Sequence, residues 1–264
     1  ASDVPAILKY TRTVYYIGNL ECARLVPGAV TFYDLNGDEV EKETSEITWD
    51  AQAAEKGGFE HFMIKEIHEQ PQAMRDTLNS LVKEGSVDLS ASGLTKEIME
   101  GVSSIYIVGC GSAWHVGIAS QYILEDMAKI PVRVELASEF RYRTLLLDKD
   151  ALVIVISQSG ETADSLAALR LAGQKGIRTL AIVNVVGSTI AREADHVIYT
   201  LAGPEIAVAT TKAYCAQLAA MYCFTVQLSM MRGTISDEEY LGMQEELMTL
   251  PAKIERILEE KDRI

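Results

Sequence analysis

The stretch LVIVISQSGET, residues 152–162, decides the fold that we expect for this chain. Its first five residues are aliphatic, which is typical of a strand buried on both faces of a parallel sheet. Two serines, a glutamine, a glycine and a threonine follow, and a helical pattern begins at Ala163. The first N–H groups of a helix lack partners inside the helix, so they favour an anion around which small hydroxyl side chains can close. The stretch predicts either a cradle for an anionic ligand or an ordinary capped helix, since serine and threonine are also common caps.

Strands and helices alternate on both sides of this stretch. Short aliphatic strands are predicted at 105–108, 132–136, 152–156, 178–183 and 197–200, and helices at 113–127, 163–174, 190–194 and 210–231. Five such strands separated by helices predict a three-layer α/β/α fold with a doubly wound, five-stranded parallel sheet. Two acidic amphipathic helices are predicted after it, at 236–248 and 253–261, and Pro251 separates them.

The first fifty residues have a different pattern. Short strands are predicted at 13–17, 29–33 and 39–43, and the pair Asn36-Gly37 predicts a turn between the last two. Three short strands rarely make an independent fold, so we expect the chain to begin inside a domain whose earlier part is missing. Residues 49–58 are expected to be a linker, followed by helices at 59–70, which Pro71 ends, and at 72–81, and then by a loop at 85–92. The expected domains are therefore 1–58, linker helices at 59–85, and 86–264.

The charge and the apolar segments exclude several classes of function. The net charge is −14, which argues against nucleic acid as a partner. The acidity lies in residues 34–69 and 236–264, so the nearly neutral middle could receive an anion, although it has no basic cluster to hold one. Residues 213–231 carry no charge and raise the question of a membrane span, but Gln217 and Gln227 favour a core helix. The four cysteines have no metal-binding or redox spacing, and no signal peptide precedes them, so we expect a cytoplasmic protein.

Three loops at the ends of predicted strands could bind a ligand. In a doubly wound sheet, ligands bind outside the carboxyl ends of strands where the strand order reverses. If the strands before Gly109–Ser112 and before Ser157–Thr162 are neighbours, both loops converge on one small anion. The third loop, 202–212, is interpreted as a turn with a helix cap at Thr210 or Thr211; in a second interpretation Val208 lies over the ligand as part of the pocket wall.

A dinucleotide and a metal are the competing ligands. Gly109 and Gly111 resemble the start of a dinucleotide fingerprint, but the third glycine would fall at Trp114, which disfavours a nicotinamide-dependent oxidoreductase. Glu135, where an acid would bind a ribose, is interpreted as an exposed strand end. The pair of histidines at 61 and 68 has no third ligand nearby, so no metal site is expected.

Five motifs occur in order along the chain: HFMIKEIHEQP at 61–71, YIVGCGSAWHVG at 106–117, ASEFRYR at 137–143, VISQSGET at 155–162 and GPEIAVATTKAY at 203–214. With these motifs the chain resembles glutamine:fructose-6-phosphate aminotransferases (isomerising), a family also called glucosamine-6-phosphate synthases. The resemblance covers the chain end to end but only the middle of the family's length. It implies that residues 1–58 are the tail of a glutaminase domain of the N-terminal-nucleophile type and that 86–264 form the first flavodoxin-like SIS (sugar isomerase) domain.

The resemblance also implies which residues contact the substrate, fructose 6-phosphate or glucosamine 6-phosphate. The implied ligands of the hexose phosphate are Ser112, Ser157, Gln158, Ser159, Thr162 and Val208. Ala113 stands where the family often has a serine, which leaves Ser112 as the hydroxyl of that loop. The family's catalytic groups lie outside this chain, so no catalytic residue, metal or cofactor is expected here. We expect a homodimer, which the apolar length of 213–231 would permit, and an isolated chain that binds sugar phosphate weakly and catalyses nothing.

Two residues beside the expected site carry alternative interpretations. Glu161 is either a general base or a partner of a helix dipole, and a base is disfavoured because this loop faces the phosphate. His115 is interpreted as a partly buried helix residue rather than as a catalytic group. The alternative function is a non-catalytic SIS-type sugar-phosphate sensor, which would more often carry a basic, DNA-binding domain in place of the glutaminase tail.

Overall fold

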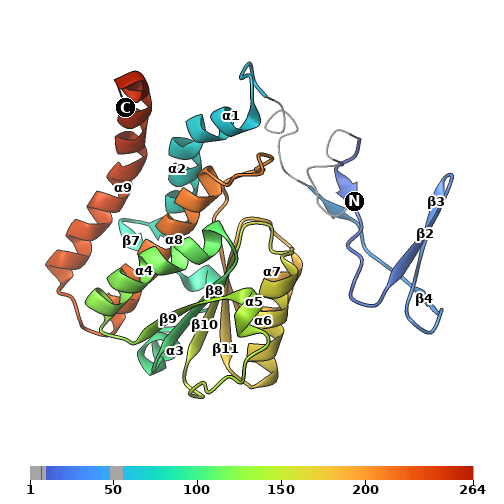
Figure 1. The fold of residues 1–264 in the computed structure, drawn as a ribbon, viewed down its shortest axis with the longest axis horizontal. Helices are drawn as coiled ribbons and strands as arrows, with labels where there is room; N and C mark the ends of the chain where they lie inside the picture. The colour runs from blue at the N-terminus through green and yellow to red at the C-terminus, as the bar shows by residue number, and fades with distance from the viewer. Residues whose placement is uncertain (1–6, 8–9, 48–55, 264) are drawn as a thin grey trace. The chain divides into compact units, whose positions relative to one another are not determined.

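The computed structural model describes residues 7, 10–47 and 56–263, and the chain divides into two compact units, Ala1–Gly57 and Gly58–Ile264. Figure 1 shows the course of the chain within each unit. Most of the linker expected at 49–58 lies outside the described residues. The helices expected at 59–85 as a separate linker lie within the second unit.

The first unit contains two small antiparallel sheets. One joins β2 (Cys22–Val26), β3 (Ala29–Tyr33) and β4 (Glu39–Val40), and the other pairs β1 (Thr13–Val14) with β5 (Ser45–Glu46). The predicted turn between β3 and β4 is present: Asp34 Oδ1 accepts hydrogen bonds from the N–H groups of Asn36 and Asp38, and Gly37 has a φ of +85°. The sequence did not predict β2, whose residues are mostly exposed and show no apolar face.

A five-stranded parallel sheet lies at the centre of the second unit. Its strands are β8 (Ile105–Gly109), β9 (Val132–Leu136), β10 (Leu152–Ser157), β11 (Arg178–Val183) and β12 (His196–Tyr199), in the order β12-β11-β10-β8-β9. The predicted α/β class and the five predicted strands are confirmed. The chain passes from β8 outward to β9 and returns to place β10 on the other side of β8, so the strand order reverses between β8 and β10.

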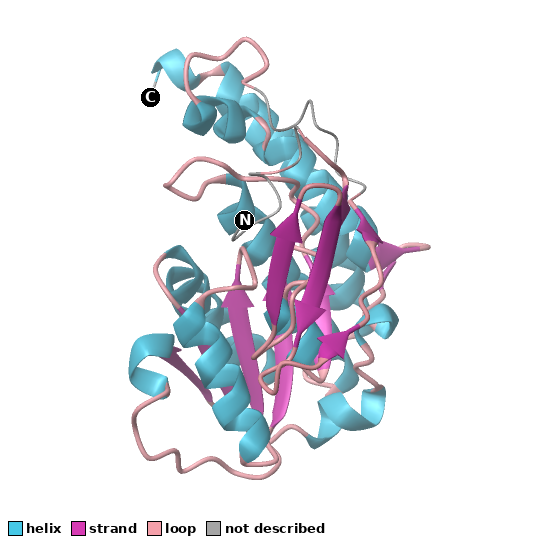
Figure 2. Ribbon diagram, turned by 90° about the vertical axis from the view of Figure 1, so that its right-hand side faces the viewer, coloured by secondary structure: helices cyan, strands magenta, loops and turns pink. Residues whose placement is uncertain are grey.

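Helices cover both faces of this sheet (Figure 2). Successive residues of a strand point to opposite faces, and because the strands are apolar at successive positions, both faces must be buried. Ile105 and Ile107 of β8 face the cluster to which α4 (Ser112–Ala128) and α8 (Lys212–Met231) contribute. Tyr106 and Val108 face the opposite cluster, which is covered by α5 (Ala137–Phe140), α6 (Ala163–Gln174) and α7 (Thr189–Glu193). The result is the expected three-layer arrangement.

The uncharged segment 213–231 is a core helix, as predicted. It forms most of α8, which is largely buried and packs against α2 (Gln70–Leu81) and α4. Within the described part of the chain, no helix has the length and apolarity that a membrane crossing needs. Because α8 buries its apolar residues in its own unit, its apolar length is not available as a subunit interface, and that support for a dimer is lost.

The segments before the parallel sheet form short elements. Helix α1 (Phe62–His68) ends before Pro71, which lies in the first turn of α2, where a missing N–H group is tolerated. The segment expected to be a loop, 85–92, contains strand β7 (Ser86–Val87) and a 3₁₀ turn, η2 (Ser90–Ser92). Strand β7 forms a short hairpin with β6 (Val82–Lys83), which precedes the segment. Helix α3 (Lys96–Gly101), which the sequence did not predict, precedes β8.

The prediction of two separate helices around Pro251 is wrong. One helix, α9 (Asp237–Glu259), runs through the proline, and a short 3₁₀ turn, η3 (Lys261–Arg263), follows it. A proline inside a helix costs roughly 3 kcal/mol. The helix continues because Leu247, before the proline, and Ile254, after it, pack on the same apolar cluster, and Pro251 itself is buried.

Candidate ligand-binding site

The loops after β8 and β10 meet at the point where the strand order reverses. Strands β8 and β10 are hydrogen-bonded neighbours, so the predicted convergence of the two loops is confirmed. They enclose a cavity of about 180 Å³. Residues of both loops, of the first turn of α6 and of the region around the start of α8 line it: Cys110, Ser112, Ala113, Ile156, Ser157, Gln158, Ser159, Thr162, Ser165, Thr210 and Gln217.

The loop Ser157–Thr162, which we call the cradle, is curled by its own hydroxyl groups. Ser157 Oγ accepts a hydrogen bond of 3.1 Å from Gly160 N–H and lies 3.1 Å from Thr162 Oγ1. Ser159 Oγ accepts a bond of 3.2 Å from Glu161 N–H. Gly160 has a φ of +65°, which allows the chain to reverse there. Three hydroxyl groups are thereby held within one short loop.

Two helices begin at this cavity. Helix α4 starts at Ser112 and helix α6 at Ala163, and both are long enough to carry a helix dipole. Thr162 occupies the cap position of α6, but its side chain accepts no hydrogen bond from the first turn in the region that the structure describes. The ordinary capped helix is therefore not what the structure shows. None of the described lining residues is charged, so an anion would be held by hydroxyl groups and backbone dipoles.

Five of the six residues expected to bind the ligand line this cavity: Ser112, Ser157, Gln158, Ser159 and Thr162. Val208 is not among the described lining residues, and its side chain is fully exposed. Sequence reasoning missed Cys110, Ser165, Thr210 and Gln217 as lining residues. Ser165 could have been found, because it lies one helical turn from Thr162. The signal for Gln217 was its uncharged polar side chain within an apolar helix.

The exposure of Val208 follows from how its loop is held. We call residues 203–211 the strap. Glu66 Oε1 of α1 accepts hydrogen bonds from Ile206 N–H (2.6 Å) and Ala207 N–H (3.1 Å). Glu66 is buried, so these bonds fix the middle of the strap against α1. Val208 follows directly and points into solvent rather than into the cavity.

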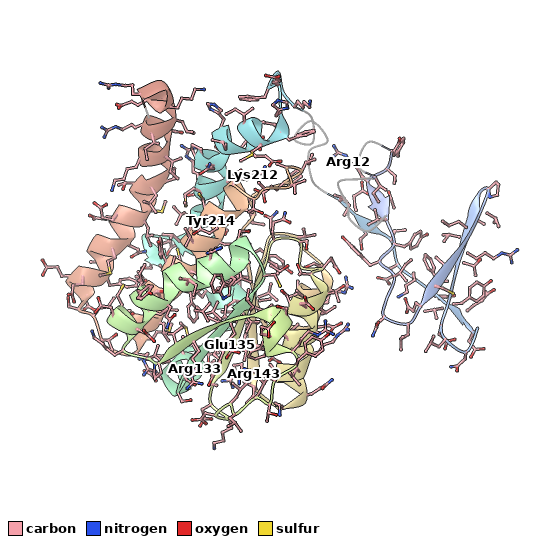
Figure 3. All side chains as sticks on the ribbon, viewed as in Figure 1. Arg12, Arg133, Glu135, Arg143, Lys212 and Tyr214 are labelled. Carbon is pink, nitrogen blue, oxygen red and sulfur yellow. The ribbon has the colours of Figure 1, made fainter. Side chains whose placement is uncertain are left out.

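The start of α8 is capped by a carboxylate instead of by a threonine. Glu205 Oε1 accepts hydrogen bonds from Thr211 N–H (2.9 Å) and Ala213 N–H (3.2 Å). Thr211 holds the cap position, yet its side chain makes no cap hydrogen bond with the described residues, contrary to the prediction. Burial raises the pKa of Glu205, and the neighbouring Glu66 raises it further, while the two N–H groups and Lys212 lower it. Figure 3 shows Lys212 at the same end of α8.

Asn184 connects the cradle with the strap. It follows β11, is buried, and donates its N–H group to the carbonyl oxygen of Gln158. Its side chain accepts a hydrogen bond from Ala202 N–H and donates one to the carbonyl oxygen of Gly203, both at 2.7 Å. Through its backbone and its side chain together, this one residue fixes the relative positions of two loops at the cavity.

Two carboxylates that the sequence singled out, Glu161 and Glu135, have structural partners. Glu161 Oε1 accepts a hydrogen bond of 2.7 Å from Thr189 N–H at the start of α7, which favours the dipole-partner interpretation over a base. His115 is exposed rather than partly buried. Glu135 is half-buried and accepts a bond of 2.6 Å from Arg143 Nε, so its interpretation as an exposed strand end is wrong (Figure 3).

The close packing that a glycine at position 114 would allow is provided by Gly117, further along α4. A Cβ on Gly117 would lie 2.7 Å from Val134 Cγ1 and 2.9 Å from Ile107 Cγ2. The close approach of helix and sheet that the dinucleotide fingerprint achieves at its third position therefore occurs one turn later. Trp114 fits because it lies before that contact, half-buried in the first turn of α4.

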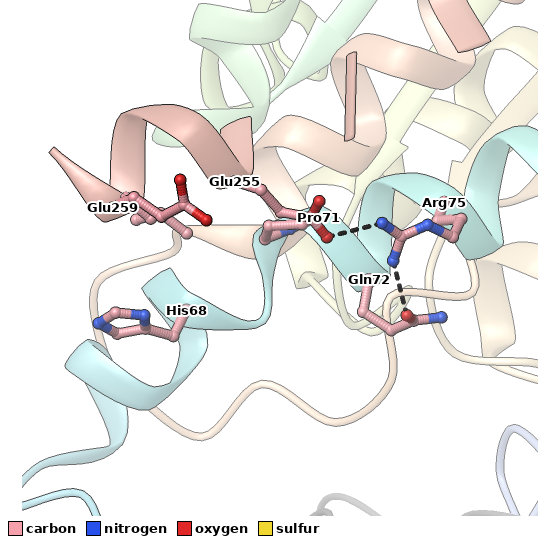
Figure 4. Close-up of a pocket in the computed structure, with 7 residues that line it drawn as sticks. His68, Pro71, Gln72, Arg75, Glu255 and Glu259 are labelled. Carbon is pink, nitrogen blue, oxygen red and sulfur yellow. Dashed lines mark hydrogen bonds and ion pairs between the residues drawn. The ribbon is translucent and has the colours of Figure 1, made fainter. Parts of the chain in front are cut away.

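A larger hollow of about 390 Å³ lies between α2 and α9 (Figure 4). The guanidinium group of Arg75, which lines this hollow, already has partners within the protein. It lies 2.7 Å from the carboxylate of Glu255 and donates a hydrogen bond of 2.9 Å to the amide oxygen of Gln72. His68, which also lines it, has its ring 5.2 Å from that of Phe59. Among the described residues, no group of three histidines, cysteines or carboxylates could hold a metal. The smaller cavity at the strand ends is the better ligand site.

The fold and the site belong to the class of SIS domains: the SIS domain family matches residues 98–227, which contain the whole parallel sheet and the cradle. The glutamine–fructose-6-phosphate aminotransferase (isomerizing) of Clostridium acetobutylicum is 51% identical over 100% of this chain and 44% of its own length. That of Methanosarcina mazei is 43% identical over 100% of this chain and 43% of its own. A solved structure, the C-terminal domain of glucosamine-fructose-6-phosphate aminotransferase from Francisella tularensis, is 36% identical with a TM-score of 0.77 and covers 79% of this chain and 59% of that one. The chain belongs to the glutamine–fructose-6-phosphate aminotransferase family and spans less than half the length of these two relatives.

Proposed function

We propose that this chain is the hexose-phosphate-binding part of an enzyme that makes glucosamine 6-phosphate from fructose 6-phosphate and glutamine. The observation that carries the proposal is the cavity at the strand-order reversal, where two helices begin and the hydroxyl groups of Ser157, Ser159 and Thr162 gather. The relatives named above act, by their names, on fructose 6-phosphate and glutamine. The five polar residues of the expected set that line the cavity are the proposed ligands: Ser112, Ser157, Gln158, Ser159 and Thr162.

The lining suits a phosphate monoester better than a nucleotide. A phosphate group offers acceptor oxygens, and hydroxyl and backbone N–H groups are donors that need no counter-charge. The described lining residues include no aromatic side chain on which a base could stack. In this proposal the cradle and the starts of α4 and α6 hold the phosphate, and the chain supplies binding rather than chemistry.

The wider assignments belong to the same proposal. Residues 1–58 would be the end of the glutaminase domain, and the protein would be a cytoplasmic homodimer. The four cysteines are free in the structure, which suits a reducing compartment. Light scattering of the purified chain measures the oligomeric state directly.

The first experiment measures thermal unfolding with fructose 6-phosphate, glucosamine 6-phosphate, fructose and NAD. A ligand that binds only the folded state stabilises it by about 2.7 kcal/mol at a concentration of 100 times Kd. We expect both sugar phosphates to raise the Tm, and we expect fructose, which lacks the phosphate, and NAD to leave it unchanged. Stabilisation by NAD alone would contradict the proposal.

The second experiment locates the bound ligand through Cys110, which lines the cavity. Burial raises the pKa of Cys223 to about 12 and also raises that of Cys215, so neither thiol should be alkylated in the folded protein. Cys22 is exposed and is replaced by serine to remove its signal. Fructose 6-phosphate should slow the alkylation of Cys110 in this Cys22→Ser protein. An unchanged rate at saturating ligand would place the sugar phosphate elsewhere.

A further inference from the structure

Helix α8 brings a buried amide group to the ligand cavity. Gln217 lies in the second turn of this helix and is only 1% exposed, yet it is one of the residues that line the cavity. Its Oε1 atom has no hydrogen-bond partner among the described residues. Burying an amide oxygen without a hydrogen-bond partner is energetically unfavourable and rare in folded proteins, so such a group calls for a specific explanation.

The position of Gln217 differs from that of the proposed phosphate ligands. Ser112 and the cradle lie at the starts of α4 and α6, where the helix dipoles favour an anion. Gln217 and Thr210 belong to α8 and to the strap before it, which line the same cavity but are distant in the sequence from the starts of α4 and α6. A side-chain amide both donates and accepts hydrogen bonds, so it suits a sugar hydroxyl group, which does the same.

We propose that Gln217 is a substrate-binding residue whose amide group hydrogen-bonds to a hydroxyl group of the sugar, while the cradle holds the phosphate. This inference rests on the proposed function, since it assigns a contact within the same cavity. It accounts for the presence, among the apolar residues of α8, of an amide oxygen without a partner in the described part of the chain, because the partner arrives with the ligand. A site that contacts a hydroxyl group by a buried amide also distinguishes a sugar phosphate from inorganic phosphate.

The test is the variant Gln217→Met, which keeps the length of the side chain and removes the amide. Titration calorimetry with fructose 6-phosphate and with inorganic phosphate measures the two parts of the site separately. We expect the Kd for fructose 6-phosphate to rise roughly tenfold, the equivalent of about 1.4 kcal/mol, and the Kd for phosphate to stay unchanged. The Tm without ligand should not fall, because Oε1 has no described partner in the protein to lose.

A matched control lies on the same helix. Gln227 Oε1 accepts a hydrogen bond of 2.9 Å from Tyr240 Oη. The variant Gln227→Met should therefore lower the Tm and leave both affinities unchanged, which is the opposite pattern. Ser159→Ala, in the cradle, should weaken fructose 6-phosphate and phosphate together.

Three outcomes overturn the inference and can be told apart. If Gln217→Met binds fructose 6-phosphate as tightly as the unchanged protein, Gln217 makes no contact with the sugar. If it loses stability without ligand and no affinity, Gln217 has a structural role, for example through a buried water molecule. If the unchanged protein binds neither fructose 6-phosphate nor phosphate, the proposed function itself fails and the assignment of Gln217 fails with it.

Discussion

Gly160 is the residue at which the cradle tolerates least change. Its φ of +65° disfavours any side chain, and a Cβ at this position would lie 2.0 Å from Ser188 Oγ and 2.5 Å from Ser188 Cβ. We expect Gly160→Ala to destabilise the protein by at least about 1–2 kcal/mol, the cost of the left-handed backbone alone. The clash also displaces the N–H group that donates to Ser157 Oγ, so binding of fructose 6-phosphate should weaken at least tenfold. Urea unfolding and calorimetry measure the two effects.

Gly176 provides the control for backbone strain. Its φ is +69°, close to that of Gly160, but a Cβ there would meet no atom within 4 Å. Gly176→Ala should therefore lose a similar amount of stability from the backbone term and keep its affinity for the sugar phosphate. Equal losses of affinity in both variants would show that the cradle is sensitive to global stability and not to the clash with Ser188.

The sequence predicted those cavity-lining residues that are close together in the chain. Ser157, Gln158, Ser159 and Thr162 follow one buried strand, so residue type and position were sufficient to find them. Gln217 comes from a helix sixty residues later, and only the packing of α8 against α4 brings it to the cavity. The sequence could not indicate that Val208 points away from the cavity, because its outward direction depends on hydrogen bonds from the neighbouring residues of the strap to Glu66, which is far away in the sequence.

At the scale of the elements, Glu205 of the strap caps the start of α8, and its titration makes the free energy of unfolding depend on pH. Burial raises its pKa above the ordinary value of 4.5, so the folded protein holds this proton more tightly than the unfolded chain does. The free energy of unfolding should therefore fall as the pH rises from about 4.5 through the raised pKa, and then stay constant. In Glu205→Gln this fall should disappear, and because both N–H groups donate to the same oxygen, an amide can keep both bonds. Urea unfolding from pH 4 to 8 measures the difference between the two proteins.

Glu239 gives a control of opposite sign. It forms a capping box with Ser236 at the start of α9, and the hydrogen bonds from Ser236 lower its pKa. Its contribution is present above the ordinary value of 4.5 and is lost as the pH falls through the lowered pKa. The difference between the unchanged protein and Glu239→Gln should therefore grow with rising pH, whereas the difference for Glu205→Gln should change in the other direction. A pH-independent effect of Glu205→Gln would contradict a raised pKa.

The strands of the parallel sheet were the elements best predicted from sequence. β9 and β11 have the predicted bounds, β8 and β10 are one residue longer at the carboxyl end, and β12 is shifted by one residue at both ends. The central strands β8 and β10 were easy to find because strands buried on both faces are continuous aliphatic runs. The errors occur where tertiary contacts override local preference. Pro251 favours a helix end by its own chemistry, but the shared apolar cluster of Leu247 and Ile254 keeps α9 continuous.

At the scale of the whole molecule, the two units differ in how much apolar core they contain. Within the described part of the first unit, only Val14 and Phe32 are buried apolar residues, whereas the second unit contains both large apolar clusters. Small sheets with so little burial open at low free-energy cost. We expect trypsin to cleave first in the first unit, for example after the exposed Arg24 of β2, and to leave a resistant fragment that contains Gly58–Ile264.

That fragment should bind fructose 6-phosphate with the affinity of the whole chain, because all eleven residues that line the cavity lie in the second unit. Mass spectrometry over a digestion time course identifies the cleavage order, and calorimetry on the purified fragment measures the affinity. Saturating fructose 6-phosphate should slow cleavage within the second unit and leave the cut after Arg24 unaffected, since a ligand protects only the unit whose folded state it binds. If cuts in both units appeared together, the first unit would not open more easily than the second. If the fragment lost its affinity, the binding site would depend on the first unit as well.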